Sequence, residues 1–328
     1  MEYRTFGSLN WNVSAIGFGA WAIGGNMWGP QDDAESVRAL HRALDLGVNF
    51  IDTAQVYGKG HSEEIIGRVL KERSEDIYVA TKVPPAIVGW PPPQDGDVDD
   101  YFPKNYVVEK LEGSLRRLGR DYVDVYQFHS WASAFNLNSR WYEEMSMLRE
   151  QGKIRAIGVS VPDTLPDNII GALAQGHVDA VQVIYNIFEQ YPQRNLLPIS
   201  ERLGVGIIVR VPFDEGALTG KYTVETTFPD NDVRQKYFRN RNLPAVVDRV
   251  REIEVFKNRL HPEMSMAEYA LRFCLSHAAV STVIPGIRNP QQAEWNTAAA
   301  DGFLLDDDEL KALERFAWTK DFWNEEVE

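Results

Sequence analysis

The sequence predicts a closed (β/α)8 barrel that forms a single domain over residues 1–328. Eight short apolar runs alternate with segments of helical periodicity along nearly the whole chain. Such regular alternation implies parallel strands joined by right-handed crossovers. No low-complexity tract separates two domains. Eight units favour a closed barrel, and a doubly wound open sheet is the alternative.

The predicted strands follow a short hairpin-like opening. Each is an apolar run of strand length rather than helix length. They lie at residues 13–19, 48–52, 77–82, 122–129, 154–160, 178–186, 205–210 and 280–286.

The predicted helices carry apolar residues at three- and four-residue spacing. In the first, at residues 32–46, Val37, Leu40 and Leu44 fall on one face. Asp32 or Asp33 can cap its free N–H groups, and a left-handed glycine can end it. The others lie at 61–71, 104–118, 140–151, near Asn168, and at 193–203, 245–260 and 290–300.

Two connections, after the third and the seventh strands, are longer than a barrel repeat requires. Residues 84–102 contain Trp90-Pro91-Pro92-Pro93 and an acidic stretch, and are interpreted as a functional lid or a disordered insertion. Residues 212–244 contain a basic cluster, which is more typical of a solvated face than of a phosphate contact. Its members are Arg234, Lys236, Arg239 and Arg241.

The charge balance excludes two classes of partner. The chain has 34 Lys and Arg against 48 Asp and Glu, a net charge of −14. Nucleic acids and anionic membranes both require clustered cations, so neither is expected as a partner. The sequence has no signal peptide and no long apolar run, which predicts a cytoplasmic protein.

The single cysteine predicts no intrachain disulfide and no cysteine metal cluster. Cys274 lies in an apolar, helical stretch and is interpreted as a core residue. No metal site is expected.

Polar residues end most of the predicted strands. In a parallel barrel these ends form the ligand-binding face. Each residue has a structural alternative, such as a helix cap or a buried, hydrogen-bonded ring, but an acid, a base and an imidazole on consecutive strand ends favour a site. A buried Asp52 and Lys82 would satisfy each other as an ion pair. The strand-end residues are Asp52, Lys82, His129, Ser160 and Arg210, with Gln182 inside the sixth strand.

Tyr57 lies in the loop that follows Asp52. A free tyrosine has a pKa of about 10 and is a weak acid at neutral pH. A neighbouring ammonium favours the phenolate and lowers that pKa toward the operating range. Tyr57, Lys82 and Asp52 therefore form a candidate general acid/base set.

Two glycine-containing loops near the end of the chain suit an anion. Barrels often hold phosphate with the loops after strands seven and eight. Here these loops are residues 212–221, which end in Lys221, and residues 285–292, which contain Arg288 and open a helix at Pro290.

These residues and motifs resemble those of the aldo-keto reductase superfamily, and its bacterial and potassium-channel β-subunit-like branches in particular. The resemblance runs from Gly17-Phe18-Gly19 to the region of Asn296. Its most specific parts are Phe50-Ile51-Asp52-Thr53-Ala54 through Tyr57-Gly58, residues 62–67, Ala80-Thr81-Lys82, residues 124–129, residues 152–160, 182–186, 216–222 and 284–296.

The resemblance implies a TIM barrel that binds NADP(H), with NAD(H) as a possibility, and reduces an aldehyde or ketone by hydride transfer. It implies a catalytic set in which Tyr57 donates the proton, Lys82 lowers its pKa, Asp52 pairs with Lys82 and His129 orients the carbonyl. The implied cofactor residues are Gly19, Ala20, Trp21, Asp52, Ser160, Gln182, Arg210, Pro212, Phe213, Gly216, Leu218, Gly220, Lys221, Gly286, Arg288, Gln292 and Asn296. The preference for NADP(H) depends on Arg288 and the family tendency.

The sequence departs from the family pattern at three places. Val161 follows Ser160 where many members have Asn, which removes a second contact to the nicotinamide carboxamide. Arg210 replaces an aromatic residue, and its planar guanidinium is expected to stack on the nicotinamide ring. The third departure is the insertion at 84–102. The expected substrate-lining residues are Trp21, Trp28, Tyr57, Trp90, His129 and Trp131, with core packing as the alternative for Trp131.

Two other functions stay open. One is a nicotinamide-binding regulatory subunit with little turnover, like the channel β-subunits. The other is an aldolase that forms a Schiff base at Lys82, although a neighbouring Asp52 would keep that amine charged. The expected partner is a small carbonyl substrate, and the expected assembly is a monomer or a small homo-oligomer.

Overall fold

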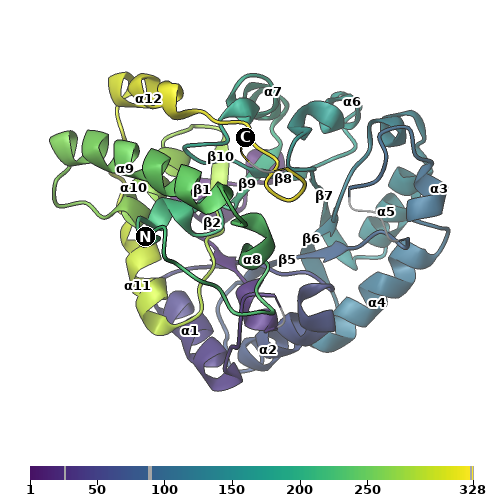
Figure 1. Ribbon diagram of the computed structural model, residues 1–328. Coiled ribbons are helices and arrows are strands. Elements are labelled where there is room, and N and C mark those ends of the chain that lie inside the picture. The colour runs from purple at the N-terminus through teal and green to yellow at the C-terminus, as the bar shows by residue number, and fades with distance from the viewer. Residues whose placement is uncertain (26, 88–90, 326, 328) are drawn as a thin grey trace.

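The computed structural model describes residues 1–25, 27–87, 91–325 and 327. Eight parallel strands form one sheet whose first and last strands are joined by the bridges Ile16–Val283 and Gly19–Gly286. The predicted (β/α)8 barrel is therefore confirmed (Figure 1). In chain order the barrel strands are β3 (Phe18–Gly19), β4 (Phe50–Asp52), β5 (Tyr78–Val83), β6 (Val123–Phe128), β7 (Ile154–Ser160), β8 (Ala180–Ile184), β9 (Gly206–Arg210) and β10 (Val280–Val283).

An N-terminal hairpin precedes the barrel, as expected. Its strands β1 (Tyr3–Thr5) and β2 (Asn12–Ser14) pair antiparallel. Phe6 stacks on Trp11 and on Phe50 of β4, so the hairpin packs on the apolar layer inside the barrel. The single strand expected at 13–19 is thus wrong in detail. Residues 12–14 pair with β1, and only 18–19 pair with β4.

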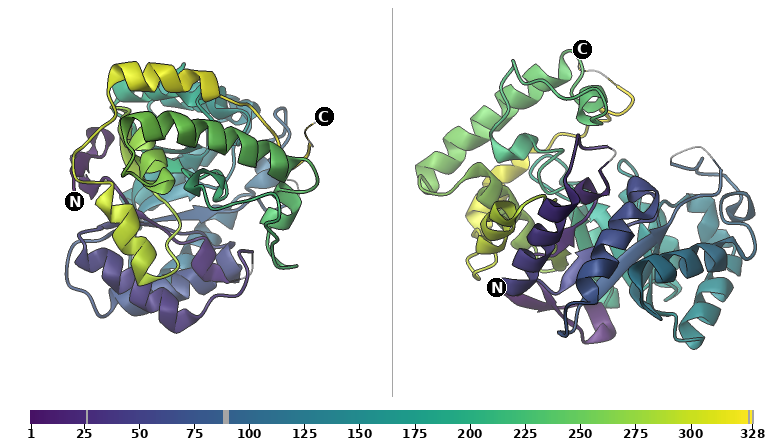
Figure 2. Two further views of the ribbon diagram at one scale, coloured as in Figure 1. Left: turned by 60° about the vertical axis from the view of Figure 1, so that its left-hand side comes forward. Right: turned by 90° about the horizontal axis from the view of Figure 1, so that it is seen from below.

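Helices surround the strands (Figures 1 and 2). The first begins as predicted, because the Asp32 carboxylate accepts the N–H of Glu35 at 2.8 Å. None of the helices in the described part of the chain is long and apolar enough to cross a membrane. The helices around the barrel are α1 (Asp33–Asp45), α2 (His61–Leu70), α4 (Tyr106–Leu118), α5 (Arg140–Glu150), α6 (Ile170–Ala174), α7 (Leu196–Leu203), α9 (Asn242–Leu260), α10 (Met266–Leu275) and α11 (Pro290–Ala298). The short helices α3 (Val98–Tyr101), α8 (Arg234–Tyr237) and α12 (Asp307–Leu313) lie in the connections and near the C-terminus.

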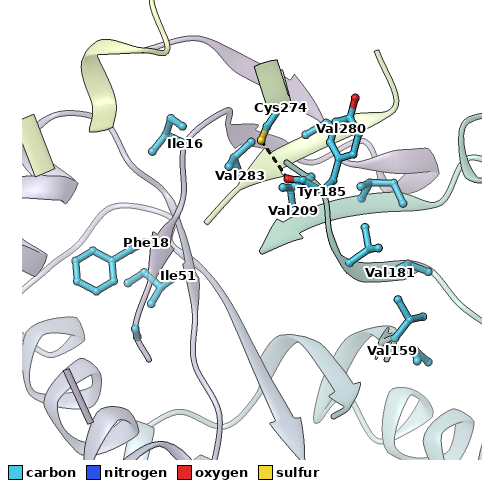
Figure 3. Packing of buried hydrophobic residues seen from close by; sticks show 14 of the residues in the cluster. Ile16, Phe18, Ile51, Val159, Val181, Tyr185, Val209, Cys274, Val280 and Val283 are labelled. Atoms are coloured by element: carbon cyan, nitrogen blue, oxygen red, sulfur yellow. Dashed lines mark hydrogen bonds between the residues drawn. The ribbon is translucent and has the colours of Figure 1, made fainter. Parts of the chain in front are cut away.

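The larger core lies between the strands and the helices (Figure 3). Aliphatic side chains such as Ile51, Val159 and Val209 are fully buried there. Cys274 of α10 lies in the same core with its Sγ 3.2 Å from the carbonyl oxygen of Tyr185. Cys274 is fully buried, so its expected place as a core residue is confirmed, and burial raises the pKa of its thiol.

A smaller apolar layer fills the barrel interior, and the polar strand-end residues lie above it. Phe50, Ala80 and Ala180 belong to the apolar layer. Because side chains alternate along a strand, Asp52, Lys82 and Gln182 point inward two residues further on. The side chains of Asp52, Lys82 and Gln182 therefore lie at the C-terminal mouth of the barrel.

Gly19 has a structural role at the closure of the barrel. A Cβ at this position would lie 2.5 Å from the carbonyl oxygen of Ile284 and 2.8 Å from that of Pro285. Only glycine allows β3 to approach the chain after β10 this closely.

The described part of the long connection after β5 is ordered against the next loop. The carbonyl oxygen of Gln94 accepts the N–H of Ala134, and its side chain accepts the N–H of Ser133 at 3.0 Å. Phe102 packs edge-on against Phe128 of β6. Trp90 lies outside the described residues.

Candidate active site

A buried ion pair lies at the centre of the barrel mouth. The Lys82 ammonium donates to the Asp52 carboxylate at 2.6 Å and to the carbonyl oxygen of Thr53 at 2.7 Å. The Lys82 side chain is 0% exposed and that of Asp52 is 3% exposed. Burial lowers the pKa of Lys82, but Asp52 and Tyr57 more than compensate and the net shift is upward. Lys82 is therefore an ammonium at neutral pH.

Two glutamines complete the surroundings of Asp52. Gln182 donates to the second carboxylate oxygen at 2.7 Å, and Gln127 donates to the same atom at 3.2 Å. The sequence did not single out Gln127 for this role, although a polar residue two positions before His129 on a buried strand was a signal. Gln182, expected to bind cofactor, also orients Asp52.

Tyr57 is brought to Lys82 by a tight turn. The ammonium of Lys82 lies 3.2 Å from the Tyr57 hydroxyl. The turn fits because Gly24 packs against it, since a Cβ on Gly24 would lie 2.7 Å from the carbonyl carbon of Tyr57. Gly24, Tyr57 and Lys82, which lie apart in the sequence, are thus in contact.

The pKa of Tyr57 differs from the expectation. Burial raises it, and the charge of Lys82 opposes that rise without cancelling it. The expected lowering by Lys82 is real as a contribution, but the net shift is upward because the hydroxyl is poorly solvated. Tyr57 is therefore protonated at neutral pH and able to donate.

His129 lies across from Tyr57. The two rings meet edge to face with centroids 5.8 Å apart. Burial, with the nearby charges of Lys82 and Arg210, holds the pKa of His129 well below its usual range. Its ring is neutral at pH 7 and can still donate one N–H.

Aromatic residues flank this polar centre. Trp21 stacks on Tyr57 with centroids 6.1 Å apart, and Trp28 packs edge-on against Trp21 at 5.2 Å. Trp131 is different, since it is fully buried among Phe128, Phe135 and Trp141. The structure thus favours the core-packing alternative for Trp131.

The strand ends beyond Asp52 hold three of the expected cofactor residues. Ser160 of β7 pairs in register with Gln182 of β8, and both are buried. Arg210, at the end of β9, donates to the carbonyl oxygen of Val161 at 3.0 Å and to the Asp163 carboxylate at 2.6 Å. Its Nε is buried without a hydrogen-bond partner in the described chain. Arg210 thus has an unused donor at the barrel mouth.

The loop after β9 contains the carboxyl groups of Asp214 and Glu215, which would repel an anionic ligand if both were charged and unpaired. Asp214 is buried and its carboxylate accepts the ammonium of Lys320 at 2.7 Å. Burial, reinforced by Asp214 and Asp163, raises the pKa of Glu215 to about 8. Neither group therefore presents an uncompensated negative charge at neutral pH that would exclude an anionic ligand from this loop. The expected residues Pro212, Phe213, Gly216, Leu218 and Gly220 lie in this loop, followed by the exposed Lys221.

The expected adenosine-side residues are assembled at the start of α11. The Gln292 side chain accepts the N–H of Arg288 at 2.8 Å, and Asn296 donates to the carbonyl oxygen of Gly286 at 3.4 Å. The Arg288 guanidinium donates to Gln31 and to the carbonyl oxygen of Pro30. These contacts fix the position of the Arg288 guanidinium, a type of group that can pair with a phosphate.

The residues of the basic cluster at 234–241 have different surroundings. Arg234 pairs with Asp232 and lies 4.7 Å over the ring of Trp28. Arg239 donates to the carbonyl oxygen of Phe322. Arg234 thus joins the loop after β9 to the aromatic residues near Tyr57, whereas Lys236 and Arg241 are exposed, as expected for a solvated face.

Comparison with known proteins gives consistent matches. The Aldo/keto reductase family model matches residues 15–317. Aldo-keto reductase YhdN of Bacillus subtilis is 32% identical over 317 residues, covering 95% of this chain and 92% of the relative. The NADH-specific methylglyoxal reductase of Escherichia coli is 30% identical over 323 residues, covering 94% and 96%. Plant proteins named probable voltage-gated potassium channel subunit beta also match.

Solved structures agree with the sequence matches. A glycerol dehydrogenase of Gluconobacter oxydans superposes with a TM-score of 0.77 at 31% identity, over 96% of this chain and 94% of that one. The barrel, the set of Asp52, Tyr57, Lys82 and His129, and these matches lead to one conclusion. The chain belongs to the aldo/keto reductase family of oxidoreductases.

Proposed function

We propose that this protein is an NADPH-dependent reductase of aldehydes or ketones. The observation that carries the proposal is the position of Lys82, which contacts Asp52 and Tyr57 at once while the His129 ring faces Tyr57. A reduced nicotinamide bound at the mouth would supply the hydride to the carbonyl carbon.

The chain's own residues supply the proton and stabilise charge. Tyr57 carries its proton at neutral pH and donates it to the carbonyl oxygen. The ammonium of Lys82 stabilises the phenolate that remains, and Asp52 keeps that ammonium charged and oriented. Neutral His129 offers an N–H to the carbonyl oxygen without competing as the acid.

The cofactor is assigned to the donors on the other side of the mouth. We assign Ser160 and Gln182 to the nicotinamide, the loop after β9 to the pyrophosphate, and Arg288 to the adenosine end. The preference for NADPH rests on Arg288, whose fixed guanidinium suits a phosphate. The name of the E. coli relative specifies NADH, so both reduced nucleotides belong in the test.

The substrate is proposed to be a small carbonyl compound with an apolar body. Trp21 stacks on Tyr57 and Trp28 packs against Trp21, and the buried Nε1 of Trp28 has no hydrogen-bond partner in the described chain. An oxygen near the carbonyl group would satisfy that donor. We propose a monomer or small homo-oligomer as the working form, without nucleic acid or membrane as a partner.

The test is oxidation of NADPH and NADH by the purified chain with a panel of activated aldehydes and ketones, followed by absorbance. We expect turnover with at least one carbonyl. Tyr57→Phe should reduce kcat by about 100-fold or more and leave cofactor affinity unchanged, because only the proton donor is lost. Tyr191→Phe, which removes an exposed hydroxyl, is the matched control and should keep wild-type turnover.

Two results would contradict the proposal. Tight NADPH binding without turnover across the panel would indicate a regulatory subunit. Aldol cleavage without cofactor, trapped by borohydride on Lys82, would indicate a Schiff-base aldolase. The structure disfavours the aldolase, because the ammonium of Lys82 donates to three acceptors and its pKa is raised.

A further inference from the structure

The loop after β9 adopts a backbone that its own sequence does not favour. Val211, Asp214 and Glu215 all have positive φ, at 53°, 47° and 55°. Residues with a Cβ rarely adopt these angles, and β-branched valine least of all. We call residues 211–221 the cofactor loop. Contacts from outside this loop must hold its strained part in place.

Most of those contacts come from the barrel and its nearby helices. Asn186 donates to the carbonyl oxygen of Val211 at 2.9 Å. Tyr237 of α8 donates to the Asp214 carboxylate at 3.0 Å, and Tyr222 donates to the carbonyl oxygen of Glu215 at 2.9 Å. These contacts are all neutral donors, so none of them compensates the buried charge of Asp214.

The compensating charge comes from the C-terminal segment. Lys320 lies 106 residues after Asp214, and its ammonium donates to the Asp214 carboxylate at 2.7 Å. The two side chains are 3% and 2% exposed. Figures 1 and 2 show this C-terminal segment, in yellow, beside the green segment around α8. A buried pair of this kind is strongly destabilised when one partner is removed.

The ammonium of Lys320 is itself held in a defined place. It lies over the rings of Phe188, Trp318 and Phe322, at 5.1, 5.6 and 5.6 Å from their centroids. The N–H of Trp318 donates to the carbonyl oxygen of Phe188 at 2.9 Å, which fixes the segment to the loop after β8. The barrel strands end at Val283, so this segment is not needed to close the sheet.

We propose that Lys320 is a positioning residue for the cofactor. Its pairing with Asp214 holds the strained part of the cofactor loop in the conformation that receives the pyrophosphate. The same pairing turns the negative charge of Asp214 inward, away from that anion. This inference rests on the proposed function, since it takes the loop as the pyrophosphate site.

The first measurement needs no cofactor. Hydrogen–deuterium exchange of the cofactor-free full chain is compared between wild type and Lys320→Met, which keeps the length of the side chain and removes its charge. We expect the amides of residues 211–221 to exchange about tenfold faster or more in the variant. Lys320→Arg should restore most of the protection, because its cation reaches the same carboxylate.

The second measurement is the Kd of NADPH by calorimetry on the same proteins. We expect Lys320→Met to raise the Kd by about tenfold or more, and Lys320→Arg to stay close to wild type. Lys257→Met is the matched control, since it removes a lysine that is 3% exposed and donates to the carbonyl oxygen of Met264 rather than to a carboxylate of the cofactor loop. It should lower thermal stability and leave loop exchange and Kd within about twofold of wild type.

The outcomes separate the two proposals. If wild type binds NADPH and Lys320→Met binds it equally well, the positioning role is wrong while the reductase proposal stands. If wild type binds neither NADPH nor NADH, the proposed function fails and the positioning role with it, whatever the exchange shows. If Lys320→Met does not fold, Asp214→Asn takes its place. Unchanged exchange and affinity in Asp214→Asn would overturn the inference.

Discussion

At the scale of single residues, the candidate site depends on one carboxylate that satisfies three donors. Asp52 accepts from Lys82, Gln127 and Gln182, and its side chain is only 3% exposed to water. A buried carboxylate with this set of partners is stable only while the cation is present, because its desolvation is not repaid by neutral amides alone. The ion pair of Asp52 and Lys82 therefore affects both the stability of the fold and the candidate site.

This arrangement predicts the cost of removing Lys82. Lys82→Met leaves Asp52 buried without a cation, so we expect the free energy of unfolding to fall by about 3–5 kcal/mol, together with loss of turnover. Urea unfolding measures the stability. The double variant Lys82→Met with Asp52→Asn should recover a large part of it while remaining inactive. A single variant as stable as wild type would show that the pair carries little electrostatic strain.

The site was only partly predictable from sequence, and the residues show why. Asp52, Lys82 and His129 stand at strand ends, where position alone implies a shared mouth. Gln127 and Lys320 act through contacts with Asp52 and Asp214, which lie far away along the chain. Their partners follow from the closed barrel and the path of the C-terminal segment, which no local pattern encodes.

At the scale of elements, the cofactor loop and its neighbours concentrate acidic groups in a poorly solvated place. Burial raises the pKa of Glu189 to about 7 and that of Glu215 to about 8. The two share the acidic neighbours Asp163 and Asp214, which add to the effect of burial on both pKa values. The charged groups facing them are Asp163, Asp214, Arg210, Arg234 and Lys320.

The direction of the pH effect follows from these raised values. An unfolded glutamate has a pKa of about 4.3, so above that pH the folded protein holds protons that the unfolded chain has lost. We expect the free energy of unfolding to decrease as pH rises through the window from about 4.5 to about 8, by about 1.4 kcal/mol for each unit of displaced pKa at most.

Urea unfolding at several pH values between about 5.5 and 8.5 tests this expectation. Glu215→Gln should flatten the decrease, because the glutamine stays neutral throughout. Exposed Glu252 provides the control, and Glu252→Gln should retain the wild-type profile. A wild-type stability that rises with pH over this window would contradict the assignment of buried, protonated carboxyl groups.

Elements differed in how well the sequence predicted them. β7 occupies the residues expected, because its apolar run is bounded by polar turns. The opening strand was misjudged, since residues 13–19 read as one strand that the chain divides between the hairpin and the barrel. That division depends on which strand each half of the segment can pair with in the folded chain. The apolar pattern of the segment alone does not predict its pairing partners.

At the scale of the whole molecule, the net charge of the protein has the same sign as the charge of its proposed ligand. The chain carries a net charge of −14, and a nicotinamide dinucleotide is also an anion. The cations placed for binding are few and local, and Arg210 and Arg288 are already bonded to neighbouring groups. Affinity must therefore come from short-range donors, while the long-range field opposes approach.

That balance predicts an unusual response to salt. The Debye length shortens from about 30 Å at 0.01 M to about 8 Å at 0.15 M ionic strength, which screens the distant acidic surface before it screens contacts inside the site. We expect the association rate constant for NADPH to rise over this range, because the repulsion that slows encounter is weakened. Stopped-flow quenching of tryptophan fluorescence measures it, since Trp21 stacks on Tyr57 and Trp28 packs against Trp21. Sucrose at matched viscosity controls for changes in diffusion. An association rate constant that falls with salt would show that the local cations, and not the net charge, govern the approach of the cofactor.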